Sequence, residues 1–184
     1  MDEVEIEDGR PRRTWFVLHV KPRTEKKVFA FLEAIGAFRY LPLYKKTVRV
    51  QRRKVVRYLP IFPGYVFTRL YSDERTRVYG TGHIVKMIVV TRPRHMVHQL
   101  RQIARAGRLA PDLEPVPDFS VGDLVKVEFG PFRGMEGYVR RKDGLTRLVL
   151  VLDILGQAVE VTIDPRDLKK EENASARPSG SGRG

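Results

Sequence analysis

The feature that most constrains the fold is a proline-rich segment, "LAPDLEPVPDFS" at 109–120, which divides the chain into two parts. Its three prolines interrupt any helical or strand periodicity, and proline stiffens such a segment into an extended spacer. We therefore expect a flexible linker at 110–119 between one domain at 14–109 and a second at 120–170. We expect residues 1–13 and the Ser/Gly-rich tail at 171–184 to be disordered.

The positive charge of the chain is concentrated in the first of these units. The net charge is +13, and residues 14–109 alone carry 21 Lys or Arg against four Asp or Glu. A field of this density favours a polyanionic partner, most simply nucleic acid. The alternative is that these charges only keep the protein in solution.

The first unit alternates strand-like and helix-like patterns. "TWFVLHV" is β-branched and aromatic, as in a buried strand, and Val28, Phe31, Leu32 and Ile35 then repeat at helical spacing up to Gly36. We expect an α+β domain, a small antiparallel sheet with flanking helices. Its further elements are strands at 37–44, 61–70 and 83–90, a hairpin at 46–59 with its tip at 51–53, and helices at 72–80 and 92–107.

The second unit has a different pattern. Short alternating strands are separated by turn signals at Gly122, Gly130, Gly144 and Gly156, at a spacing near ten residues. Such spacing is typical of a small all-β barrel, and this length can close about five strands.

Three motifs resemble the NusG family of transcription elongation factors: "WFVLHVKPRTEKKV", "FPGYVF" and "VGDLVKVEFGPFRGMEGYV". The first unit resembles the NusG N-terminal domain and the second an SH3-like KOW barrel, so the resemblance covers 14–170. It implies a monomeric, cytoplasmic, bacterial transcription elongation and antitermination factor. Both a general factor and a specialised RfaH-like paralogue remain open, and the basic first unit favours the paralogue.

The resemblance also implies contacts with RNA polymerase. In the family, aromatic residues around F-P-G-Y form a hydrophobic pocket for the clamp helices of the largest subunit, and a second segment touches a gate loop of the second subunit. The first set corresponds here to Trp15, Phe62, Pro63, Gly64 and Tyr65, and the second to Arg75, Thr76 and Arg77. The alternative for Trp15 and Phe62 is that they belong to the ordinary core.

Nucleic-acid contacts follow from the same resemblance. Family members hold the turn after their first strand near the non-template DNA strand, which places Lys21, Arg23 and Lys26 there. Arg49, Arg52, Arg53 and Lys54 at the hairpin tip form a second basic projection toward upstream duplex or RNA. The alternative is that these are individually solvated charges.

In the barrel, Phe132 and Leu155 correspond to the rim that binds the termination factor Rho or NusE, the ribosomal protein. The family commonly has Phe where this chain has Leu155. In RfaH-like relatives the C-terminal domain can refold into a helical hairpin, and four leucines here have helical spacing. The glycines of this unit disfavour such a helix, so we expect strands.

Catalysis is not expected. The basic unit has four carboxylates without an acid/base pairing, His95 and His98 have no further metal ligand nearby, and no phosphate-binding glycine loop is present. We therefore expect no cofactor, no metal and no membrane span. Two alternatives remain open: a KOW-containing ribosome-associated or RNA-binding protein, and an adaptor without DNA contact.

Overall fold

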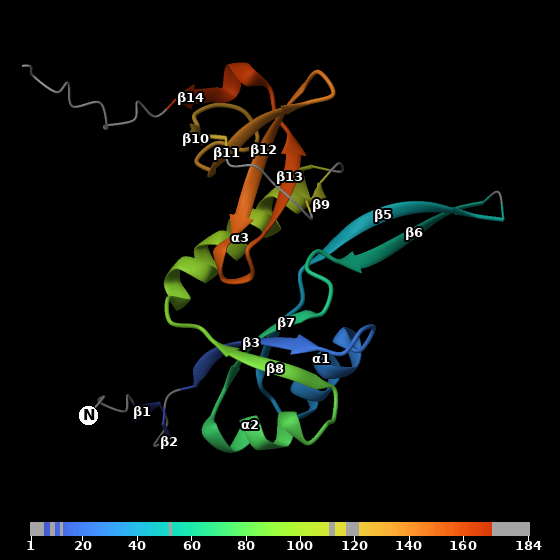
Figure 1. The fold of residues 1–184 in the computed structure, drawn as a ribbon, viewed down its shortest axis with the longest axis vertical. Coiled ribbons are helices and arrows are strands. Elements are labelled where there is room, and N and C mark those ends of the chain that lie inside the picture. Colours follow the sequence, from blue (N-terminus) through green and yellow to red (C-terminus); the bar gives the residue numbers. More distant parts are fainter. Residues whose placement is uncertain are drawn as a thin grey trace, which may run out of the picture.

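The computed structural model describes residues 6–7, 10–11, 13–51, 53–110, 113–116 and 122–170, and it contains two main antiparallel sheets. Figure 1 shows one sheet for each part of the chain, with helix α3 (Pro93–Leu109) between them. The expectations for the tail 171–184 and for Arg52 lie outside the described residues. Within 1–13, the strands β1 (Ile6–Glu7) and β2 (Arg10–Pro11) pair with each other.

The first sheet has the expected α+β architecture. Its strands lie in the order β4 (Phe38–Tyr40), β7 (Tyr65–Leu70), β3 (Thr14–Val20) and β8 (Ile84–Val89), all antiparallel. Helices α1 (Glu25–Ala34) and α2 (Ser72–Tyr79) pack on one face. This face holds an apolar cluster that includes Phe16, Leu18, Val28, Leu32 and Val78.

Helix α1 begins and ends where the sequence predicts. Thr24 occupies the N-cap position, although its hydroxyl donates to the Lys21 carbonyl and does not cap the helix. After Ala34 the chain leaves the helix, and Gly36 takes a φ of +68°, a conformation that favours glycine.

A two-stranded ribbon leaves this sheet between β4 and β7. We call β5 (Leu43–Val50) and β6 (Arg53–Pro60) the basic ribbon; they pair in register from Leu43 opposite Pro60 to Val50 opposite Arg53. Figure 1 shows it extending away from the rest of the molecule. The predicted hairpin and its tip are therefore present.

The second sheet contains six strands in the order β14 (Leu168–Lys170), β10 (Asp123–Val127), β11 (Glu136–Lys142), β12 (Leu145–Leu152), β13 (Gln157–Thr162) and β9 (Glu114–Val116). Strand β9 lies within the segment interpreted as linker. Pro115 fits there because β9 is an edge strand, where a missing N–H leaves no ladder bond unmade. Leu113 and Val116 are buried, so this part of 110–119 is sheet and not spacer.

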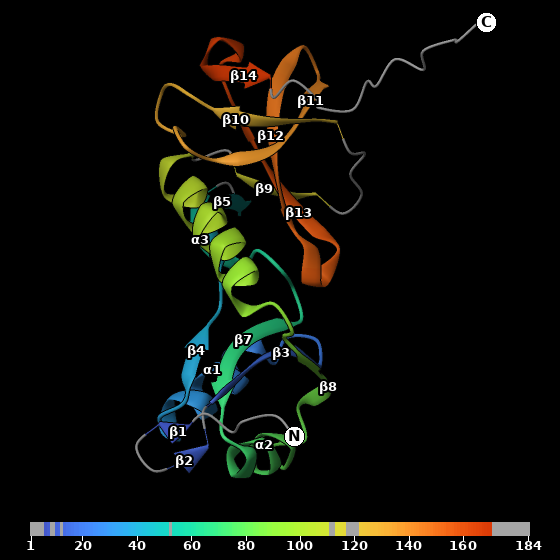
Figure 2. The same ribbon diagram turned by 90° about the vertical axis from the view of Figure 1, so that its left-hand side faces the viewer.

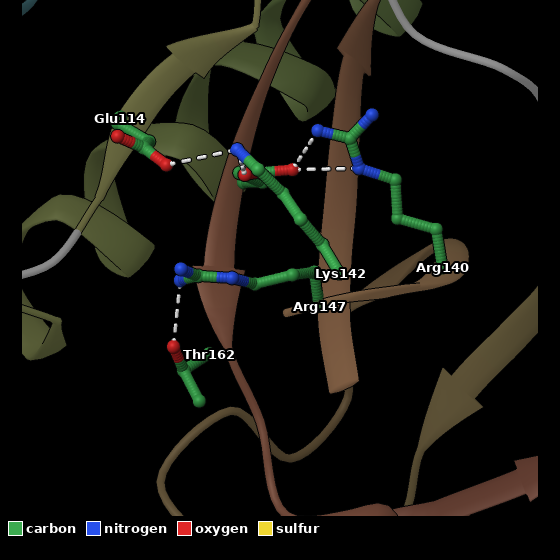
Figure 3. A network of polar contacts seen from close by, with 6 residues as sticks. Glu114, Arg140, Lys142, Arg147 and Thr162 are labelled. Atoms are coloured by element: carbon green, nitrogen blue, oxygen red, sulfur yellow. Dashed lines mark hydrogen bonds and ion pairs between the residues drawn. The ribbon is translucent and has the colours of Figure 1, made fainter. Parts of the chain in front are cut away.

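A buried ion network ties β9 to the sheet (Figure 3). Glu160 on β13 is fully buried; it accepts hydrogen bonds from Arg140 and Lys142, and Lys142 also lies 3.6 Å from Glu114 on β9. Burial would raise the pKa of Glu160, but the bonds from Lys142 and Arg140 outweigh it and lower that pKa. The carboxylate therefore remains ionised and satisfied, as a buried charge requires.

We predict that Gly137→Ala destabilises the second sheet. A Cβ at Gly137 would lie 2.5 Å from the carbonyl oxygen of Val149 on the neighbouring strand. Backbone must move to relieve this overlap, so the free energy of unfolding should fall by about 1–3 kcal/mol. Urea denaturation of the variant and the parent protein measures this change in the free energy of unfolding.

Gly107→Ala in α3 is the matched control. Its new methyl group would meet only Leu113 Cδ1, at 3.7 Å, and alanine favours the helix, so stability should rise by about 0.5–1 kcal/mol. Equal effects of the two substitutions would contradict this account of Gly137.

Candidate functional site

An aromatic face covers the side of the first sheet opposite α1 and α2. Alternate residues of a strand share a face, so Trp15, Val17 and His19 of β3 point the same way. The register places Tyr65 opposite His19, and Phe67 opposite Val17 on one side and Tyr40 on the other. We define the aromatic face as Trp15, His19, Phe38, Tyr40, Tyr65 and Phe67.

Ring contacts run across this face. Trp15 meets Phe38 edge-on at 5.0 Å between ring centroids, and His19 stacks on Tyr65 at 5.0 Å. Phe67 contacts Phe62, which lies in the turn before β7. Rigid rings that contact one another form a surface that needs little ordering when a partner binds.

Phe62 is not accessible in this structure. It is 1% exposed and belongs to an apolar cluster that also contains α3 and second-sheet residues. The expectation that Phe62 forms the floor of an open pocket is therefore corrected: the ring is core, the alternative that the sequence left open, and it contacts Phe67 within this cluster. Trp15 and Tyr65 are half-buried and stay partly accessible.

The turn at Pro63-Gly64 fixes one end of the aromatic face. Gly64 has a φ of +82°, its carbonyl accepts from the Val20 N–H, and its own N–H donates to the buried Glu25 carboxylate at 2.9 Å. The start of α1 therefore holds this turn. Pro63 is exposed.

An apolar hollow lies beside the part of the face that α3 leaves open. Its volume is about 310 Å³, and its lining combines the first sheet with α3: Trp15, Phe38, Tyr40, Val97, Leu100, Arg101 and Ala104. Phe38 is 45% exposed. The hollow shares only Trp15 with the predicted pocket: it joins Trp15 to Phe38 and Tyr40, whereas Phe62 and Tyr65 do not line it.

A groove lined by arginines shares one wall with this hollow. It measures about 550 Å³, and Trp15, Val97 and Arg101 line both. Its basic residues are Arg13, Arg69, Arg94 and Arg101, and none of its lining residues is acidic. The hollow and the groove together suit a partner with apolar and acidic groups side by side.

The predicted nucleic-acid residues lie on two other surfaces. Lys21, Arg23 and Lys26 are exposed in the turn after β3 and the first turn of α1, and Arg23 has a φ of +63°. Arg49, Arg53 and Lys54 are exposed at the end of the basic ribbon. The structure brings the residues of each set together, but the two sets lie on separate surfaces.

Arg75, Thr76 and Arg77 lie on α2, on the far side of the first sheet from the hollow. All three are exposed, and the Arg75 guanidinium lies 5.1 Å from the centroid of the Phe16 ring. Contacts made there and at the hollow would reach two separate surfaces of a partner.

Helix α3 has a second face that binds the second sheet (Figure 2). Gln99 exchanges hydrogen bonds with Asp153, Gln102 accepts from the Glu136 N–H, and Arg105 donates to the carbonyls of Pro131 and Arg133. The contact therefore combines two uncharged amides with the Arg105 guanidinium and the Asp153 carboxylate, and each of these polar groups has a hydrogen-bond partner.

His95 adds a hydrogen bond to the same contact. Its Nε2 lies 2.6 Å from Asp153 Oδ2, and this hydrogen bond lowers the pKa of the Asp153 carboxyl below its ordinary value. Because the pKa of Asp153 is lower in the folded protein than its ordinary value, this hydrogen bond stabilises the fold above the ordinary carboxyl pKa. That stability is lost as the pH falls through the lowered pKa.

Phe132 and Leu155, predicted at an exposed rim, lie instead at this contact. Phe132 is 6% exposed within the cluster that contains α3, and Leu155 is half-buried against the same cluster. In this conformation Phe132 is closed to a partner and Leu155 is partly covered, so binding of Rho or NusE through them stays a prediction.

Sequence reasoning found one face of α3 and missed the other. Within the helix expected at 92–107, Met96, Leu100 and Ile103 form an apolar stripe at helical spacing, and Gln99 and Gln102 lie beside it. Two uncharged amides on a helix rich in arginine were the available signal. Phe38 and Tyr40 were not predicted, because the pairing of β4 with β7 sets the face on which they lie, and the sequence of 37–44 does not show that pairing.

In the described residues, no group of three or more His, Cys, Asp or Glu side chains is placed to hold a metal ion. In the same part of the chain, no helix is long and apolar enough to cross a membrane.

Comparisons with known proteins agree on one family. The family model described as transcription termination factor nusG matches residues 13–106. The transcription termination/antitermination protein NusG of Synechocystis sp. is 28% identical over 187 residues, covering 85% of this chain and 89% of the relative.

A chain from the crystal structure of the MjSpt4:Spt5 complex, conformation B, is similar at 17% identity over 85% of this chain and 95% of that one. The TM-score of this match is 0.28. Since the family model covers half of the sequence, the chain belongs to the NusG family of transcription termination and antitermination factors.

Proposed function

We propose that this protein is a bacterial, cytoplasmic elongation and antitermination factor that binds RNA polymerase through the hollow beside Trp15. The observation that carries the proposal is an aromatic concavity on a strongly cationic unit of a NusG-family chain. The family consists of non-enzymatic transcription factors, so binding alone must produce the effect. Residues 14–109 act as the polymerase-binding domain and 120–170 as the KOW domain of a monomer.

The tip of the clamp helices is the proposed occupant of the hollow. A few large, rigid side chains in a desolvated pocket supply most of the energy of an interface, and Trp15 and Phe38 are suited to that role. The neighbouring arginine groove favours a tip that also carries acidic side chains. Tyr65 extends the contact, while buried Phe62 supports it from below.

A second contact involves α2 and the gate loop of the other large subunit. Arg75, Thr76 and Arg77 face away from the hollow, so one molecule can touch both jaws of the polymerase. A protein that binds the closed clamp better than the open one shifts the population toward the elongating form and suppresses pausing.

The KOW domain would recruit Rho or NusE through Phe132 and Leu155. Because α3 and the adjoining core cover these side chains in this conformation, we propose that partner binding requires the barrel to leave α3. The barrel can then bind Rho or NusE only after it has left α3. Competition between α3 and the partner sets the affinity of the barrel for that partner.

Replacing Trp15 and Phe38 together by Ala should weaken retention on core RNA polymerase by at least about tenfold, the loss of one hot spot. Co-sedimentation with purified polymerase measures it, with circular dichroism to confirm the fold. Phe62→Ala is a poor test, because deleting a buried ring costs about 3–5 kcal/mol of stability.

Val85→Ala with Leu145→Ala is the matched control, since both side chains are exposed and lie outside the hollow and outside α2. Normal retention of the Trp15/Phe38 variant would refute the polymerase site and favour a ribosome-associated or RNA-binding KOW protein.

Changing Lys21, Arg23 and Lys26 to Gln should reduce crosslinking to the non-template strand in a reconstituted elongation complex, because three phosphate-attracting charges are lost. The same number of charges removed from the barrel, at Lys126, Arg133 and Arg141, should leave it unchanged. Unaltered crosslinking of the first variant would point to an adaptor without DNA contact.

Gln99→Glu should release the barrel, since it places a carboxylate against Asp153 and removes a donor to it. Amide shifts of 131–136 and 153–155 should move, and affinity for Rho or NusE should rise. Gln51→Glu makes the same chemical change in the ribbon turn as a control. Unchanged shifts and affinity would exclude gating by α3.

A further inference from the structure

The basic ribbon carries charge that its own structure does not neutralise. Residues 43–60 contain seven Lys or Arg and no Asp or Glu. The six whose side chains the structure describes are all exposed: Lys45, Lys46, Arg49, Arg53, Lys54 and Arg57.

The strand register adds to the repulsion. Lys46 lies directly opposite Arg57, and Arg49 directly opposite Lys54. Like charges in cross-strand pairs destabilise a ribbon, and a two-stranded ribbon is marginal even without them. An anionic partner would attract both pairs, and this attraction would offset the repulsion between the like charges.

The two pairs face opposite ways. Positions 46 and 49 differ by an odd number, so their side chains lie on opposite faces of the ribbon. Exposed apolar side chains accompany the charges on both: Val56 (46% exposed) and Tyr58 (59%) beside Arg49, and Val50 (40%) and Val55 (38%) beside Lys46. Both faces therefore carry exposed charge and exposed apolar side chains. The base of the ribbon meets the rest of the chain, where Tyr44 packs against the core and Lys45 and Lys46 line a hollow beside Glu114.

These features match the major groove of B-form DNA. That groove is about 12 Å wide and admits a two-stranded β-ribbon, and a phosphate backbone runs along each wall. A ribbon inserted there meets phosphates with both faces, whereas one lying on a flat surface uses a single face. The major groove of duplex RNA is too narrow for such a ribbon.

We propose that the basic ribbon inserts into the major groove of double-stranded DNA, with Lys46 and Arg57 against one phosphate wall and Arg49 and Lys54 against the other. The inference rests on the nucleic-acid binding of the proposed function and adds a second contact to it. Lys21, Arg23 and Lys26 meet the non-template strand, whereas the ribbon binds duplex DNA and does not need polymerase to do so.

The test measures fluorescence anisotropy of the full-length protein, without polymerase, on a labelled 20-base-pair DNA across a salt series. Lys46→Gln with Arg57→Gln, and separately Arg49→Gln with Lys54→Gln, should each make the slope of log K against log salt shallower by about 2, one unit for each phosphate contact. Lys27→Gln with Lys86→Gln, two exposed charges of the same domain, should leave the slope unchanged.

Binding to the same sequence as duplex RNA or as single-stranded DNA should be at least tenfold weaker. Equal affinity for all three nucleic acids would overturn the proposal, as would an effect confined to one pair, or stronger binding to anionic vesicles than to DNA. Thermal melting should show that neither ribbon variant loses stability, because each removes a repulsion.

The outcome is separable from the polymerase site. A Trp15/Phe38 variant that no longer binds polymerase should still bind duplex DNA normally, and ribbon variants should still co-sediment with polymerase.

Discussion

Packing of α3 between two sheets is the interaction on which the rest of the structure depends. One side of the helix closes part of the aromatic face and so creates the hollow beside Trp15. The other side holds the barrel through Gln99, Gln102 and Arg105. A single helix therefore decides how much of each binding surface is open, and moving it would change both.

Charge and apolar surface have separate roles in this arrangement. The cations lie on the ribbon, on the turn after β3 and around the arginine groove, while the aromatic rings lie between them on one sheet face. Electrostatic attraction acts over about a Debye length and governs the approach of a polyanion. Apolar contact acts only once surfaces touch, and it governs which partner stays bound.

The sequence predicted the local structure well because local patterns determine it. Helix α1, the hairpin and the α+β order follow from the spacing of residues such as Val28 and Leu32. The burial of Phe62 was left open as an alternative and that of Phe132 was not expected, because both depend on a cluster whose residues lie far apart in sequence. Strand β9 was missed because Pro115 was taken to exclude a strand, although an edge position accepts it.

The most direct test of the central claim is hydrogen exchange of the chain alone and on RNA polymerase. The account predicts that binding protects amides around Trp15, Phe38–Tyr40 and 97–104. Protection confined to the barrel or to α2, with the hollow exchanging as in the free protein, would contradict it.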